Sequence, residues 1–204
     1  MNRVRGILAG LGLAAVAVAP SAQAQSLAPA RTTEFGVAAG VAFPQGDGLD
    51  GVNTGFTVAG SLGFKPVNMP VGFRLEALYA RFGSDEVSMS DENGSFSADG
   101  HIGFFGGTGN VIVTVPTASA VRPYLIGGAG VYHVSAKIDA SVTGGEGGGS
   151  FSVSDSETKF GLNGGAGLEF VMGSLRPFVE ARFHSVFTSE ENANFIPVTF
   201  GLKF

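Results

Sequence analysis

Six ionisable side chains recur at alternate positions within short apolar segments of this sequence. They are Arg74, Glu76, Glu169, Glu180, Arg182 and His184. Residues two apart in an extended chain point to the same side, so each segment would gather its charges on one face. Such groups could catalyse proton transfer, or they could pair with one another where water is excluded. Because a lone buried charge is costly, we predict a network in which the two arginines pair with the three glutamates.

The main catalytic alternative is a hydrolase site built from Glu180, His184 and Ser185. A nucleophilic serine must lie within hydrogen-bond reach of the histidine that activates it. Neighbouring residues of a strand point to opposite faces, so His184 and Ser185 do not readily meet. A lipid-modifying enzyme is therefore the least favoured interpretation, and we predict no catalytic residues.

The sequence indicates no cofactor, metal or nucleic-acid site. Glycine clusters at 106–109, 127–130 and 164–167 lack the spacing of phosphate-binding loops, and glycine inside a strand more often marks close packing or curvature. His101 and His133 lack companion ligands at metal spacing, and the chain has no cysteine and a net charge of −5. The acidic loops could hold cations weakly, although plain solvation is the expected state.

The elements that would position the ionisable residues are β-strands, because apolar residues alternate with small or polar ones. In 71–80, for example, Phe73 and Leu75 alternate with Arg74 and Glu76. Near His101 and His133 the phase is ambiguous, and a bulge could shift it. The strands expected from the pattern are 34–43, 56–65, 71–80, 102–115, 122–134, 159–170, 178–187 and 195–204.

The connections between these strands alternate in length. Short turns are expected at 65–70, 116–123 and 172–177. Longer loops, which hold most of the acidic residues, are expected at 44–54, 83–97, 139–158 and 188–194. The glycine-rich run within the third loop should be mobile. Short turns on one side and long loops on the other are typical of up-and-down barrels of the outer membrane.

The faces opposite the apolar ones carry mainly Gly, Ala, Ser and Thr. Charged residues make up only 14% of the chain, whereas a soluble surface is about 25–35% charged. Small residues suit the inside of a narrow barrel, and the apolar faces would then meet lipid, which forces the sheet to close on itself. We therefore predict an all-β fold, an eight-stranded antiparallel up-and-down transmembrane β-barrel with a polar interior.

The first residues have the pattern of a cleavable signal peptide. Arg3 and Arg5 precede an apolar run at 6–19, and Ala22 and Ala24 frame a small-residue cleavage site. The run is too short for a spanning helix, which needs about 20 residues. We expect a signal peptide at 1–24 and a single barrel domain at 25–204. A membrane anchor is the alternative, and lipidation is excluded because there is no cysteine.

Several segments resemble the small outer-membrane β-barrel proteins with an OmpA-like or OmpX-like barrel domain. They are 36–47, 72–83, 122–132 and the ending FIPVTFGLKF at 195–204. The resemblance implies that alternate residues of this ending form the signal that the outer-membrane assembly machinery recognises. These are Val198, Phe200, Leu202 and Phe204. One departure is that aromatic girdles usually contain Trp and Tyr, whereas this chain has no Trp, three Tyr and 18 Phe.

These observations favour a non-enzymatic outer-membrane protein that acts through acidic surface loops in adhesion or envelope contact. The alternative is a narrow channel or a carrier of small apolar ligands, since eight strands leave room for side chains or one small ligand. We expect a monomer in outer-membrane lipid, with both termini in the periplasm and the long loops outside the cell. The sequence does not identify a surface partner.

Overall fold

The computed structural model describes residues 33–66, 69–84, 87–91, 94–143, 148–188 and 191–204. The expected signal peptide at 1–24 and the start of the expected barrel domain at 25–32 lie outside these ranges. No helix among the described residues is long and apolar enough to cross a membrane.

The described residues form nine strands and one short 3-10 helix. In chain order these are β1 (Thr33–Gln45), η1 (Asp47–Leu49), β2 (Gly55–Phe64), β3 (Val71–Gly83), β4 (Val87–Asp91), β5 (Gly94–Thr114), β6 (Val121–Thr143), β7 (Gly149–Phe170), β8 (Arg176–Val186) and β9 (Ala193–Lys203).

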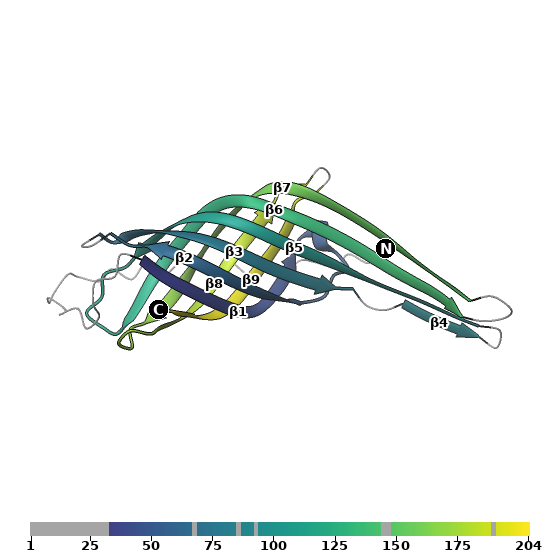
Figure 1. Ribbon diagram of the computed structural model, residues 1–204, viewed down its shortest axis with the longest axis horizontal. Helices are drawn as coiled ribbons and strands as arrows, with labels where there is room; N and C mark the ends of the chain where they lie inside the picture. The colour runs from purple at the N-terminus through teal and green to yellow at the C-terminus, as the bar shows by residue number, and fades with distance from the viewer. Residues whose placement is uncertain (1–32, 67–68, 85–86, 92–93, 144–147, 189–190) are drawn as a thin grey trace, which may run out of the picture.

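Eight of these strands close into a ring, which confirms the predicted barrel. The order is β3-β2-β1-β9-β8-β7-β6-β5, and an additional pairing of β3 with β5 completes the circle. Each strand runs antiparallel to its neighbours, and β1 pairs with β9 at the seam where the two ends of the ring meet. Closure pairs the backbone groups of each barrel strand on both sides (Figure 1), as lipid requires.

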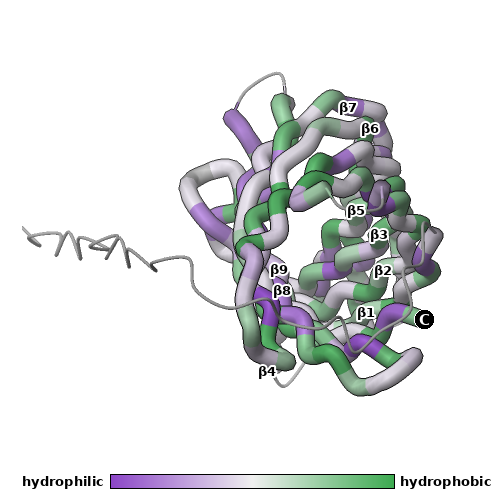
Figure 2. The backbone as a smooth tube through the Cα atoms, turned by 90° about the vertical axis from the view of Figure 1, so that its left-hand side faces the viewer, coloured by the Kyte–Doolittle hydropathy of each residue, from purple (hydrophilic) through white to green (hydrophobic). Residues whose placement is uncertain are grey.

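The side chains alternate between the outside and the inside of the ring as the sequence pattern predicts. Along β3, Phe73 and Leu75 are exposed on the outside, whereas Arg74 and Glu76 are buried. In Figure 2 the same alternation appears as green segments of the backbone separated by pale or purple ones. Most of the large apolar side chains lie on the outer surface, and such a surface suits hydrocarbon rather than water.

The structure shows which side chains near His101 and His133 face inward, and β5 and β6 pair there without a bulge. The pairing of β5 with β6 is continuous from Ser95 and Thr143 to Thr114 and Tyr124. Phe104 and Tyr132 are therefore buried inside the ring, and His133 is exposed on the outside.

Three strands are about twice as long as the others, and this corrects the predicted loops. β5, β6 and β7 have 21, 23 and 22 residues, whereas the other five barrel strands have 10 to 13. Most of 94–97 and 139–158, expected as loops, is thus regular sheet. β4 adds a fourth strand beside β5. This four-stranded extension runs beyond the barrel toward the right of Figure 1.

The barrel interior is polar only in part, which corrects the expectation of a polar interior. An apolar cluster fills the end of the barrel nearest the extension. Phe82, Phe104 and Phe195 lie at its centre, with ring centroids 5.1 to 5.8 Å apart. The inward residues change from charged to apolar along the barrel axis. In β3, for example, Arg74 and Glu76 lie at one height, and Leu78, Ala80 and Phe82 lie at the next.

Candidate functional site in the barrel interior

The ionisable residues lie on the inner face because each occupies an inward position of its strand. Arg74 and Glu76 come from β3, Glu169 comes from β7, and Glu180 and Arg182 come from β8. All five are at least nine-tenths buried. Their strands are not all neighbours, so the contacts run across the barrel.

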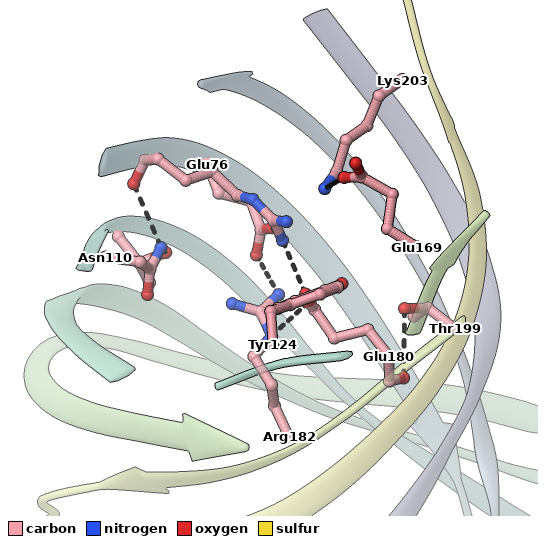
Figure 3. A network of polar contacts seen from close by, with 10 residues as sticks. Glu76, Asn110, Tyr124, Glu169, Glu180, Arg182, Thr199 and Lys203 are labelled. Atoms are coloured by element: carbon pink, nitrogen blue, oxygen red, sulfur yellow. Dashed lines mark hydrogen bonds and ion pairs between the residues drawn. The ribbon is translucent and has the colours of Figure 1, made fainter. Parts of the chain in front are cut away.

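A central cluster joins two arginines to two glutamates (Figure 3). Arg74 Nη1 donates to Glu180 Oε2 over 2.8 Å, and Arg182 Nε lies 2.9 Å from Glu180 Oε1. Arg182 also donates to Glu76, and Arg74 lies 3.7 Å from the same glutamate. Each carboxylate thus faces both guanidinium groups, an arrangement that offsets part of the desolvation cost of all four charges.

A second cluster lies toward the end that holds the short turns. Lys203 Nζ donates to Glu169 Oε2 over 2.5 Å, and Arg176 Nη1 lies 2.6 Å from Glu34 Oε1. Arg176 also approaches Glu169, at 3.7 Å. At the adjoining mouth Lys65, in the turn after β2, donates to Thr114, and burial is the main cause that lowers the pKa of Lys65.

Two aromatic rings connect the clusters. The Tyr124 hydroxyl donates to Glu180 Oε2 over 2.6 Å. The ring of Tyr124 lies between cations, with Arg74 Cζ at 5.8 Å and Lys203 Nζ at 4.9 Å from its centroid. Phe178 contacts the same two cations, at 5.6 Å and 5.1 Å. Cation–π contacts strengthen where water is displaced. The two rings therefore lie between the two ionic clusters and contact a cation of each.

Sequence reasoning does not place four members of this arrangement in the network. They are Glu34, Tyr124, Arg176 and Lys203. The alternation puts Glu34 and Tyr124 on inner or mixed faces without giving them a role, and it puts Arg176 in a turn. Lys203 shares the inward phase of the last strand, since it alternates with the exposed residues Leu202 and Phe204. Its phase is the signal that could have identified it.

His184 lies apart from the charges with which the sequence pattern groups it. Its Nδ1 is 2.9 Å from the Tyr132 hydroxyl, and its ring stacks on Phe195 at 5.0 Å. No ion pair of His184 occurs among the described residues. The histidine belongs instead to the boundary between the ionic and apolar zones, and its immediate partner is a tyrosine rather than Ser185.

Some buried polar atoms near this boundary have no protein partner among the described residues. They include both side-chain polar atoms of Asn163, Nη1 of Arg182 and Nε2 of His184. Asn163 pairs with His184 across neighbouring strands, so their side chains share a face. A cavity of about 10 Å³ lined by Arg182 and His184 lies here, which is about the space of one water molecule.

The arrangement offers ion pairing and close packing rather than an evident reaction centre. Among the described residues, no three His, Cys, Asp or Glu side chains are grouped so that they could hold a metal ion. The expected assembly residues Val198, Phe200, Leu202 and Phe204 alternate along the outer face of the last strand and its end, and all four are exposed. Phe204 N donates to Phe35 O over 2.9 Å, so the final residue also closes the seam.

Comparisons with known proteins agree with this geometry. The sequence matches the outer membrane protein beta-barrel domain family over residues 11–204. No curated protein matches the chain. Neisserial surface protein A is similar in structure, with 18% identity, a TM-score of 0.53, and coverage of 85% of this chain and 96% of that chain.

A major outer membrane protein from Thermus thermophilus is also similar. It is 15% identical, with a TM-score of 0.51 over 85% of this chain and 99% of that chain. Likeness at this level of identity concerns the fold, an antiparallel barrel with an apolar outer surface. The chain therefore belongs to the outer-membrane β-barrel protein family, and its ring lies in the lipid of the outer membrane.

Proposed function

We propose that this protein is a non-enzymatic surface protein of the outer membrane whose extension of β4–β7 contacts material outside the cell. The observation that carries the proposal is the contrast between a filled barrel and a long sheet that stands clear of it. A strand of about 9–11 residues suffices to cross the membrane, so half of β5, β6 and β7 serves another purpose.

The filled interior argues against transport as the main role. Two ionic layers and an apolar cluster occupy successive heights of the barrel. Eight-stranded barrels leave an interior just wide enough for side chains. A channel or a carrier of small apolar ligands would need these layers to move aside, whereas a contact role leaves them in place.

The orientation and assembly belong to the same proposal. Both described ends, Thr33 and Phe204, lie at the end of the ring opposite the extension (Figure 1), which supports a periplasmic location for the termini and an extracellular location for the extension. The alternating residues Val198 to Phe204 would be read by the assembly machinery. We propose a monomer, since the ring pairs all eight of its strands without a second chain.

Protease treatment of intact cells tests the proposal. Cleavage between β6 and β7, with the barrel fragment protected, is the expected result. Replacing 136–157 by a short turn should keep the barrel folded, as judged by the different gel mobility of unboiled and boiled protein. The same variant should lose attachment of cells to coated surfaces. A chain wholly protected on intact cells, or undiminished attachment by the shortened variant, would refute the proposal.

A further inference from the structure

The mouth of the barrel at the end that holds the short turns carries more positive than negative charge. The central cluster next to it is balanced, because two arginines face two glutamates. Between that cluster and the turns the described residues include four cationic side chains and two carboxylates, which leaves an excess of two positive charges. These residues are Lys65, Arg122, Arg176, Lys203, Glu34 and Glu169.

The two carboxylates of the mouth are already held by two of its cations. Lys203 Nζ donates to Glu169 Oε2 over 2.5 Å, and Arg176 Nη1 lies 2.6 Å from Glu34 Oε1. All four side chains are more than nine-tenths buried as residues, so each pair offsets its own desolvation cost. The excess positive charge therefore belongs to the other two cations.

Among the described residues, Lys65 and Arg122 lack a carboxylate partner. Lys65 donates one hydrogen bond, to the Thr114 hydroxyl over 3.2 Å, and the side chain of Arg122 makes no hydrogen bond or ion pair. Both are half-buried. Burial is the main cause that lowers the pKa of Lys65; the two carboxylates raise it, and Arg122 and Arg176 lower it further. An added anion between Lys65 and Arg122 would relieve both the repulsion and the burial cost.

The chain supplies no further acid near this mouth. The turns at 65–70, 115–121 and 171–175 contain no aspartate or glutamate, and neither do residues 1–33. Arg31 adds another positive charge to the segment that precedes β1. A group that neutralises Lys65 and Arg122 therefore has to come from another molecule.

A cavity of about 30 Å³ lies beside these cations, about the space of two water molecules. Lys65 and Thr114 are among the residues that line it. Three glycines, Gly36, Gly63 and Gly72, form part of its wall, and a Cβ at Gly63 would have no neighbour closer than 3.7 Å. The space accepts part of one small anionic group and excludes an extended ligand.

The donors of this mouth suit a phosphate better than a carboxylate. A lysine and an arginine on different strands approach from different directions, and a phosphate presents several oxygens to them. A carboxylate has two oxygens in one plane. A phosphate monoester also carries about −1.5 to −2 charges at pH 7, which matches the excess of two positive charges.

We propose that this mouth binds a phosphate group through Lys65 and Arg122, with phosphate oxygens entering the cavity beside Thr114. Arg176 and Lys203 strengthen the positive potential, and a cleft lined by one sign of charge concentrates ions of the other. The inference goes beyond the proposed function, and it uses that function only to place the mouth in the periplasm. The phosphate belongs either to a soluble ester or ion of the periplasm or to a lipid headgroup of the inner leaflet.

The test uses the full-length protein folded in maltoside micelles, which contain no phosphate, and inorganic phosphate as the probe. Isothermal titration calorimetry in low-salt buffer should show saturable binding of phosphate, and acetate should bind at least tenfold more weakly. Lys65→Gln combined with Arg122→Gln should weaken phosphate binding at least tenfold. Arg81→Gln, which removes an exposed arginine of β3, should bind as the parent does.

Two further variants separate binding from folding, which the gel mobility of unboiled and boiled protein reports. Lys65→Arg keeps the charge and should bind phosphate within threefold of the parent. Gly63→Val keeps every charge but fills part of the cavity, and it should weaken binding at least fivefold. Equal phosphate binding by the parent and the double glutamine variant, or equal binding of acetate and phosphate, would overturn the proposal. Undiminished binding by folded Gly63→Val would do the same.

Lipid retention identifies the source of the phosphate. Native mass spectrometry should compare the parent and the double glutamine variant after release from nanodiscs of phosphatidylglycerol. A lipid retained by the parent and lost by the variant assigns the site to a headgroup. Equal retention by both, together with phosphate binding in micelles, assigns it to a soluble phosphate. Either result supports the proposal, and the absence of both phosphate binding and variant-sensitive retention overturns it.

Discussion

At the scale of single residues, Glu180 joins two arginines and a tyrosine in the barrel interior. Its carboxylate accepts hydrogen bonds or ion pairs from Arg74, Arg182 and the Tyr124 hydroxyl. Removing one member of a buried ionic group leaves its partners uncompensated, which typically costs about 3–5 kcal/mol. We expect Glu180→Gln to lower the free energy of unfolding by about this amount, measured by urea titration of the protein in lipid vesicles.

The matched control for this prediction is Glu157→Gln in the extension. Glu157 is paired with Lys159 at 2.8 Å, but its side chain is 45% exposed. An exposed pair contributes about 0–1 kcal/mol, so this variant should unfold almost as the parent does. Adding Arg74→Met to Glu180→Gln should recover part of the loss. Equal effects of the two glutamine variants would show that the interior pairs contribute little to stability.

Glycine at position 167 makes room for the tyrosine that joins the two ionic layers. A Cβ at Gly167 would lie 2.3 Å from Cζ of Tyr124. Gly167→Ala should therefore displace the ring and its hydrogen bond to Glu180, at a cost of about 1–3 kcal/mol, as is usual for overpacking. Gly127→Ala is the control, because the nearest atom to its Cβ would be 3.7 Å away. Thermal unfolding followed by gel mobility should separate the two, and equal midpoints would contradict this account.

The limit of sequence reasoning is clearest at this scale. Alternation assigns Arg74, Glu180 and Lys203 to a face, but not to a height along the barrel axis. Heights depend on the register between strands that are far apart in sequence, such as β3 and β8. The reversal from charged to apolar residues along one inner face is visible in β3, where Leu78 and Phe82 follow Glu76. The expectation of a wholly polar interior obscures it.

Among the elements, the barrel strands were predictable and the extension was not. Lipid contact demands large apolar residues at alternate positions, and this signal marks the eight barrel strands. Outside the membrane the alternation persists as Ser with Phe or Val in 150–154, but composition rich in Ser, Gly and Asp is typical of loops. For the extension, the alternation with a period of two predicts the strands better than composition does. The alternation reflects the geometry of the extended backbone, whereas composition reflects the solvent.

The end of β9 combines a seam contact with the proposed assembly signal. Phe204 exchanges backbone hydrogen bonds with Phe35, at 2.9 and 3.1 Å, and their rings stack at 6.3 Å. We expect deletion of Phe204 to reduce the folded protein in the outer membrane of cells at least fivefold. Refolding of the purified variant into vesicles separates the two roles, since no machinery is present there. Folding that is lost equally in vesicles and in cells would assign Phe204 to the seam alone.

In the whole molecule, three layers stand in series along the barrel axis. They are the cluster of Glu169 and Lys203, the cluster of Glu180 and Arg182, and the apolar rings of Phe82, Phe104 and Phe195. The layers close the barrel by different means. The ionic ones resist opening because separated buried charges would be uncompensated, and the apolar one resists entry of water and ions because its side chains are closely packed.

This layering predicts that the barrel does not conduct ions, and conductance measurements test the closed interior directly. Purified protein in planar bilayers should show no steady channel currents, whereas a general porin in the same bilayers provides the positive control. Phe104→Ala combined with Phe195→Ala should remain closed, because it opens only the apolar layer and leaves both ionic layers intact. Adding Glu180→Gln and Arg182→Ala should also leave the barrel closed, because the layer of Glu169 and Lys203 remains. Adding Glu169→Gln and Lys203→Ala as well should produce brief openings, because all three layers are then disrupted. Stable, reproducible currents from the unmodified protein would show that the layers move together, and the channel interpretation would then replace the contact role.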